Sequence, residues 1–408
     1  MPASGMQAGL GGDPNIFGPT TSYPGPTNLP GQVEFYLKGR LNTDMMAGSD
    51  SLDRGGGTKS GPIYFGEYAR LYTGFAGTAA DGLQFGAYLE IRQNGGGLGS
   101  STTANTLYFR RETGYVKGDW GKFQFGQIDG VSGQFLTGVI TNFDTGGWHS
   151  PDLVYLFSGN AKLFWPFPRS VGYYGTSKII YVSPQYHGFD FGISYEPTQT
   201  SSGEVNCASA TLSGATCPRA STIAGPASAE HRRNMVDAVG RYMGAFGEVG
   251  VAATAGIMHA GHVKNLSAPA SDPTGVEVGL RLAYRGFAIG GNLLTGNFNG
   301  SFVPLPKGGH HETAWVAGAS YATGPFIVGA QVLSTEYQGV MDPGLGETRE
   351  FGVAVGGTFD WAPGSAVYLS MVYGQRHQHG YDFATEKPGA ASNNTRAMGF
   401  MLGNQFNW

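Results

Sequence analysis

The sequence predicts an all-β fold: a closed, transmembrane antiparallel β-barrel of about 16 strands. Three observations predict it. Only 13% of the 408 residues are charged, aromatic residues also make up 13%, and there are 69 Gly, yet no apolar run approaches the ~20 residues that a membrane helix needs. Apolar residues instead alternate with polar or small ones, which is the period of a strand between two different environments. Short turns and long loops also alternate, as they do in bacterial membrane barrels.

The first thirty residues differ from the rest. Residues 1–30 are rich in Gly, Pro, Ser and Thr without periodicity, which predicts an irregular arm. The barrel is expected over residues 31–408. Met1 to Leu10 have neither the basic start nor the apolar core of a signal peptide. If the protein is exported, we expect this sequence to be its processed form.

Period-two alternation is clearest in "VEFYLKGRL" (33–41), "LQFGAYLEIR" (83–92) and "VEVGLRLAYR" (276–285). In the first of these, Phe35 and Leu37 share one face, and Lys38 and Arg40 lie on the other. Seven short turns and eight longer connections predict about sixteen strands. The predicted strands are 31–42, 62–77, 82–93, 104–118, 121–128, 178–186, 189–196, 233–245, 247–260, 275–285, 286–297, 312–323, 325–337, 348–360, 365–376 and 394–408.

Soluble β-sandwiches and propellers are the alternatives to a membrane barrel. Their strands average about five or six residues, whereas most of the predicted strands are long enough to cross a bilayer at a tilt, which takes about 9–11 residues. About sixteen strands also enclose a water-filled lumen rather than a packed core. The polar face of each strand is therefore expected inside the barrel and the apolar face against lipid.

The cysteines and the net charge bear on location and partners. Cys207 and Cys217 lie in a polar stretch and are expected to form a local disulfide; two unrelated thiols are the alternative. A disulfide would indicate an oxidising, exported location. The formal net charge of −4 argues against a nucleic-acid partner.

Neither metal binding nor catalysis is expected from this sequence. The histidines at 310–311 and at 377 and 379 occupy polar loops without a third ligand at a suitable spacing, so neither a metal nor another cofactor is predicted. His149 and Ser150 are adjacent in an irregular loop, whereas a nucleophile and its base need a rigid element and an orienting partner. An enzyme is therefore not predicted.

The segment "RRETGYVKGDWGKFQFGQIDG" (110–130), together with the strand count and the terminal aromatic residue, resembles the sixteen-stranded general diffusion porins of Gram-negative outer membranes. That family places a long third loop directly after such a segment and folds it into the barrel. The resemblance implies a constriction loop at about 129–177 in an outer-membrane channel for passive diffusion of ions and small hydrophilic solutes. It also implies a homotrimer surrounded by lipid and lipopolysaccharide.

The resemblance further implies opposed charges at the narrowest part of the pore. By matching position, the acidic residues of the loop are Asp129, Asp144 and Asp152, with Asp144 near its tip. The facing basic residues are expected to be Lys38, Arg40, Arg70, Arg92 and Arg110, which share inward parity, and Lys178 after the loop.

Two charged residues break the inward parity. Arg111 has the opposite parity to Arg110 and is expected at a bulge, in the head-group zone or at a subunit contact. Glu67 also points outward and is expected at an interface between subunits, because a charge facing lipid is costly.

The chain ends on "MGFMLGNQFNW" (398–408), an apolar strand interrupted by Asn404. We expect it to close the barrel against the first strand. The resemblance implies that Phe406 and Trp408 form the signal read by the barrel-assembly machinery. A structural barrel that anchors the envelope, with a restricted or plugged lumen, is the alternative function; measurable conductance would distinguish the channel from it.

Overall fold

The computed structural model describes residues 30–52, 63–93, 107–141, 143–149, 151–154, 156–168, 176–199, 232–262, 269–340 and 345–408. The predicted arm, apart from Pro30, lies outside these ranges, so its conformation stays a prediction. The same holds for Cys207 and Cys217 and for Ser150.

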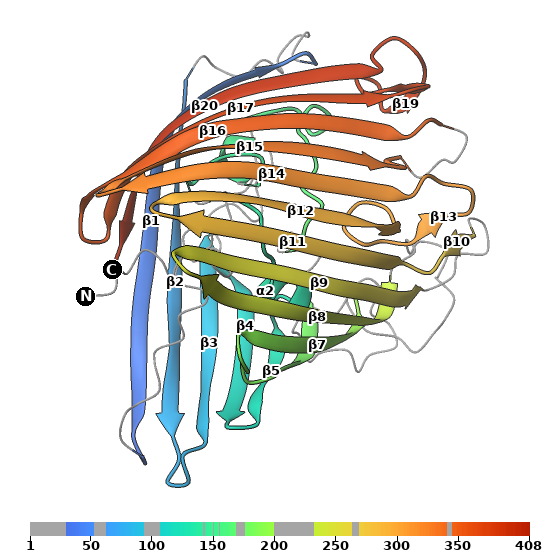
Figure 1. Cartoon of the computed structure of the whole chain (residues 1–408). Helices are drawn as coiled ribbons and strands as arrows, with labels where there is room; N and C mark the ends of the chain where they lie inside the picture. Colours follow the sequence, from blue (N-terminus) through green and yellow to red (C-terminus); the bar gives the residue numbers. More distant parts are fainter. Residues whose placement is uncertain are drawn as a thin grey trace.

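The prediction of a closed sixteen-stranded antiparallel barrel is confirmed (Figure 1). In order around the barrel, the strands are β1 (Val33–Asp50), β2 (Tyr64–Thr78), β3 (Gln84–Gln93), β4 (Leu107–Gly118), β5 (Gly121–Gln127), β6 (Ser177–Val182), β7 (Phe189–Thr198), β8 (Arg232–Phe246), β9 (Val249–His262), β11 (Thr274–Tyr284), β12 (Phe287–Asn297), β14 (Glu312–Thr323), β15 (Phe326–Tyr337), β16 (Thr348–Ala362), β17 (Ser365–Gln378) and β20 (Asn394–Asn407).

Small elements lie in the long connections. Two short sheets pair β10 (Ala270–Ser271) with β13 (Leu305–Pro306) and β18 (Tyr381–Asp382) with β19 (Lys387–Pro388). Two four-residue helices, α2 (Val131–Gln134) and α3 (Pro151–Val154), lie in the connection between β5 and β6. Among the described residues, none of the helices is long and apolar enough to cross a membrane.

The barrel closes between the first and last strands, as predicted. β1 pairs with β20 from Arg40 opposite Asn407 to Asp50 opposite Ala397. Trp408 extends this ladder, because its backbone exchanges hydrogen bonds of 3.0 and 3.1 Å with Gly39. The prediction that β1 ends at residue 42 is wrong: the strand continues to Asp50, because residues 43–50 gain a ladder with β20 that local alternation does not reveal.

Exposure follows the inside-out pattern of a membrane barrel. Outward apolar side chains are open, with exposed fractions of 82% for Phe35 and 63% for Ile257. Inward polar side chains are covered, with exposed fractions of 1% for Arg40 and 0% for Ser370. Large apolar side chains therefore face outward and polar side chains face inward, an arrangement that suits lipid around the barrel.

The short turns have the backbone that tight hairpins require. Arg285 and Gly286, between β11 and β12, have φ values of +45° and +87°. Two consecutive positive φ values match the twist of the flanking strands, and Gly adopts such values at little cost.

Asn404 has a partner on the outer surface. The indole Nε1 of Trp361, near the end of β16, donates a hydrogen bond to Asn404 Oδ1 over 3.4 Å. The ring of Trp361 also meets Phe406 edge-on, with centroids 6.4 Å apart. The amide therefore satisfies an indole N–H that an apolar side chain at position 404 would leave without an acceptor.

Candidate functional site

A β-bulge in β4 explains the two neighbouring arginines. The ladder between β3 and β4 pairs Glu90 with Arg111 but Ile91 with Phe109, so Arg110 is an extra residue. A bulge turns two consecutive side chains away from strict alternation. Both Arg110 and Arg111 are consequently buried on the inner side, with 3% exposure each. Of the three predicted settings for Arg111, the structure shows the bulge.

The two arginines meet a single carboxylate. Glu90 Oε1 lies 2.8 Å from Arg110 Nη1 and 3.2 Å from Arg70 Nη1, and Glu90 Oε2 lies 2.7 Å from Arg111 Nη1. Arg111 Nη2 also reaches Asp129 Oδ2 over 2.6 Å. We call Arg70, Glu90, Arg110, Arg111 and Asp129 the Glu90 cluster. Three guanidinium groups face two carboxylates, so the cluster has one positive charge in excess.

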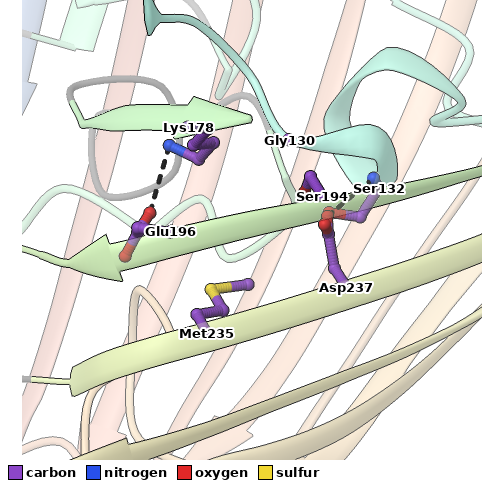
Figure 2. Close-up of a pocket in the computed structure, with 7 residues that line it drawn as sticks. All are labelled: Gly130, Ser132, Lys178, Ser194, Glu196, Met235 and Asp237. Carbon is purple, nitrogen blue, oxygen red and sulfur yellow. Dashed lines mark hydrogen bonds and ion pairs between the residues drawn. The ribbon is translucent and has the colours of Figure 1, made fainter. Parts of the chain in front are cut away.

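A second ionic group joins strands β6, β7 and β8. Glu196 accepts from Lys178 Nζ at 3.1 Å and from Arg232 Nε at 2.9 Å, and it also binds the hydroxyl of Thr176. Figure 2 shows the Lys178–Glu196 pair at one end of a small pocket. Arg232 Nη1 also donates to the carbonyl of Ser301 in the β12–β14 connection, so the group ties two distant segments together.

The connection between β5 and β6 begins at the other end of this pocket. Asp237 on β8 accepts hydrogen bonds from Ser132 N at 2.9 Å and from Ser132 Oγ at 2.6 Å (Figure 2). Gly130 and Ser194 lie beside this contact in the same pocket. A buried carboxylate on the wall therefore holds helix α2 at the start of the connection.

From there, the backbone of the connection is bound by inward side chains of β12, β15, β16, β17 and β1. Each contact joins a polar wall side chain to a main-chain atom of the connection. The wall donates in three contacts: Asn292 Nδ2 to Thr137 O (2.9 Å), Gln331 Nε2 to Ile140 O (3.1 Å) and Thr358 Oγ1 to Phe143 O (3.1 Å). The wall accepts in two contacts: Gly147 N donates to Ser370 Oγ (2.9 Å) and Ser158 N donates to Asp50 Oδ2 (2.7 Å). The connection thus follows the inner wall from β8 to β1.

Apolar packing accompanies these hydrogen bonds. Trp148, Leu153 and Phe157 of the connection belong to one buried cluster with inward residues of the wall, among them Val372 and Met401. Trp148 Nε1 also donates to the carbonyls of Val353 and Tyr373 at 3.1 and 3.2 Å. This part of the inner wall is therefore covered by the connection rather than by water.

His149 is buried within the connection. Its ring meets Trp165 edge-on at a centroid distance of 5.5 Å. Within the described part of the chain, neither ring nitrogen has a hydrogen-bond partner. Burial lowers the pKa of His149 to about 3, because the charged imidazolium would lose its hydration. The side chain is therefore neutral at ordinary pH.

The structure brings some of the predicted site residues together. Arg70, Arg110 and Asp129 share the Glu90 cluster, and Lys178 lies in the second ionic group. Asp144 lies against Gly356 of β16. That the loop acids and the basic wall face each other across the lumen stays a prediction. Of the other predicted residues, the side chain of Asp152 lies outside the described part, Lys38 and Arg40 are on β1 opposite Tyr72 and Arg70, and Arg92 is on β3 opposite Arg70 and Tyr108.

Sequence reasoning missed the carboxylates that organise these groups. Glu90, Glu196 and Asp237 are 0%, 1% and 1% exposed. Glu90 shares the inward parity of Arg92 in "LQFGAYLEIR", so its parity was a usable signal. Among the described residues, no group of three His, Cys, Asp or Glu is arranged to hold a metal ion.

A family model described as Gram-negative porin matches residues 28–401. A search of curated proteins finds no match. The fold is similar to an anion-selective porin from Comamonas acidovorans, with a TM-score of 0.57, 13% identity, and coverage of 92% of this chain and 100% of that one. It is also similar to the outer-membrane protein OmpT of Vibrio cholerae in its trimer form, with a TM-score of 0.55, 15% identity, and coverage of 92% and 99%.

Proposed function

The chain belongs to the Gram-negative porin family, and we propose that its channel is narrowest between the β5–β6 connection and the wall strands β1–β6. The protein is an outer-membrane porin, a barrel that forms a water-filled channel for passive diffusion of ions and small hydrophilic solutes. Diffusion needs no catalysed reaction, and we propose that the chain performs none.

One observation carries the proposed constriction: the connection is bound to the inner wall from β8 around to β1. The remaining part of the wall, to which these hydrogen bonds do not attach the connection, carries the Glu90 cluster and Lys178. Charges at the narrowest point of a pore decide which ions pass. We propose that Arg40, Arg70, Arg92, Arg110 and Lys38 line this wall, with Asp129, Asp144 and Asp152 on the connection.

Planar-bilayer recordings test the channel and its constriction. The purified barrel should give stepwise conductance, and a size series of sugars should show a sharp limit for entry. Neutralising Arg70 or Arg110 should shift the reversal potential in a salt gradient. Stepwise conductance with unchanged selectivity in every charge-neutralised variant would refute the proposed constriction but not the channel.

A structural envelope barrel with a restricted lumen is the second candidate. The observation in its favour is the low exposure of inward side chains, which is 1% for Tyr72, 0% for Glu90 and 3% for Arg110. Such a barrel would give almost no conductance, and liposomes containing it would not swell in sugars that the channel admits.

We also propose a homotrimer, with the outer face over β20, β1 and β2 between subunits. On this face Glu67, Thr43 and Asn404 are direct neighbours across three strands and line one groove. A carboxylate facing lipid is unfavourable, and a second subunit would remove it from lipid. Light scattering in mild detergent should give three chains for the wild type. A monomer there would refute the trimer.

We further propose what surrounds the barrel and how its assembly is directed. Lipid and lipopolysaccharide would contact the remaining apolar band. The terminal strand with Phe406 and Trp408 would be read by the barrel-assembly machinery. Phe406→Ala combined with Trp408→Ala should then lower the amount of barrel in outer membranes while the purified chain still refolds in detergent. Normal amounts in the membrane would contradict the signal.

A further inference from the structure

Glycines on the inner wall lie beneath the β5–β6 connection. From β11 around to β1, each of eight consecutive strands carries an inward glycine at which an added Cβ would meet this connection. We call this set the glycine track. Its members are Gly279 (β11), Gly290 (β12), Gly318 (β14), Gly329 (β15), Gly352 and Gly356 (β16), Gly374 (β17), Gly399 (β20) and Gly48 (β1).

Trp148 packs against two members of the glycine track. A Cβ at Gly374 would lie 2.5 Å from Cζ2 of Trp148, and a Cβ at Gly352 would lie 2.8 Å from its Nε1 and 2.4 Å from Cδ1 of Leu163. Ordinary contacts of a real Cβ begin at about 3.4 Å. The indole thus fills space that two Cβ atoms would take, and this close approach lets its N–H reach the carbonyls of Val353 and Tyr373.

The fit extends along the connection. A Cβ at Gly279 would lie 2.2 Å from Thr137 O, one at Gly329 would lie 2.6 Å from the ring of Phe143, and one at Gly399 would lie 2.7 Å from the ring of Phe157. A glycine within a strand costs about 0.5–1 kcal/mol relative to alanine. Glycines with this destabilising effect lie at the same contact surface on eight strands. This pattern indicates that their role is to let the connection approach the wall closely.

We propose that the glycine track is the seat that fixes how far the connection projects into the lumen, so that these glycines are positioning residues for the width of the channel. This inference rests on the proposed constriction. A methyl group at Gly374 requires Trp148 to retreat from the wall by about 1 Å before ordinary contact is restored. The wall strand is fixed by its ladders, so the connection moves toward the lumen and narrows it.

Single-channel conductance tests the proposal with Gly374→Ala and Gly352→Ala. Gly240→Ala is the matched control, because Gly240 lies on the exposed outer face of β8 and a Cβ there meets nothing within 4 Å. Both seat variants should conduct less than the wild type by roughly a fifth or more, because conductance follows the open area of the narrowest point. The control should conduct as the wild type does.

The outcomes separate this inference from the proposed function. Wild-type conductance together with seat variants that fold and conduct normally would overturn the glycine track alone. A wild type without conductance would refute the channel and this inference with it. Folding of each variant is checked by its heat-dependent mobility in detergent gels.

A cross-link provides a test that does not depend on tolerance of the added methyl groups. A Cβ at Gly356 would lie 2.9 Å from Cγ of Asp144, a span that fits a disulfide. Asp144→Cys with Gly356→Cys, in a chain with Cys207→Ser and Cys217→Ser, should oxidise readily. Its conductance should be equal before and after reduction, because the bond joins atoms that already touch. Failure to oxidise, or a conductance change on reduction, would overturn the seat.

Discussion

Replacing Glu90 with glutamine should change both the selectivity and the stability of the barrel. Glu90 is the only carboxylate that contacts all three arginines of the Glu90 cluster in the described structure, at 2.7 to 3.2 Å. The substitution keeps the size of the side chain and removes its charge. The excess of the cluster then rises from one positive charge to two, and three guanidinium groups lose a shared partner.

The magnitude follows from elementary electrostatics. One unit charge about 7 Å from a permeating ion contributes about 0.6 kcal/mol in water, and salt at ~0.1 M reduces this to about 0.3 kcal/mol. An anion gains this energy and a cation loses it, so the anion-to-cation permeability ratio should rise roughly threefold. Removing one partner of a buried ion pair costs about 3–5 kcal/mol of folding free energy.

Two measurements check this prediction. The reversal potential in a potassium chloride gradient should move toward the chloride equilibrium potential, and the unfolding midpoint in denaturant should fall. Glu248→Gln is the control, because Glu248 pairs with Arg285 at 2.9 Å in an exposed position at the turn after β8. An unchanged reversal potential in a Glu90→Gln barrel that folds would refute the role assigned to Glu90.

Three further predictions concern the connection and the seam. Asp237→Ala removes the acceptor of Ser132 N and Oγ, so open-channel current noise should rise, and Asp237→Asn should raise it less. Burial lowers the pKa of His149 to about 3, whereas the ordinary pKa of histidine is about 6.5. The bound connection therefore keeps its full stability above about pH 6.5. By pH 5 it loses about 2 kcal/mol, because the free imidazole binds a proton that the buried one does not. Noise should therefore rise on acidification in the wild type and stay flat in His149→Phe. Asn404→Leu should cost the barrel about 1 kcal/mol, because Trp361 Nε1 loses its acceptor; equal midpoints in denaturant would contradict this.

The barrel was predictable because its information is local. Alternation with a period of two reports the two environments of a strand directly, and short turns alternating with long connections report its topology. The closing strand was predictable for the same reason. The small pairs β10–β13 and β18–β19 were not, because two-residue strands leave no periodic pattern.

The Glu90 cluster was only half predictable. Strict parity assigns Arg70 and Arg110 to the lumen but sends Arg111 outward, and the bulge between Glu90 and Ile91 reverses that assignment. A bulge depends on how two strands pair, so the alternation within β4 alone does not predict it. The resemblance places the acidic residues on the connection, so it does not predict the wall carboxylate that binds these arginines.

The path of the connection has a signature in the strands that it covers. Leu294, Val316, Leu333, Val372 and Met401 occupy inward positions of β12, β14, β15, β17 and β20, with exposures of 0–2%. An apolar side chain facing a water-filled lumen would be wetted at a cost of about 25 cal/mol per Å². Apolar residues of inward parity in a barrel of this size therefore indicate cover from inside. The corresponding inward positions of β1–β3 carry the charged residues Arg40, Arg70 and Glu90 instead, so these strands lack the apolar signature of cover by the connection.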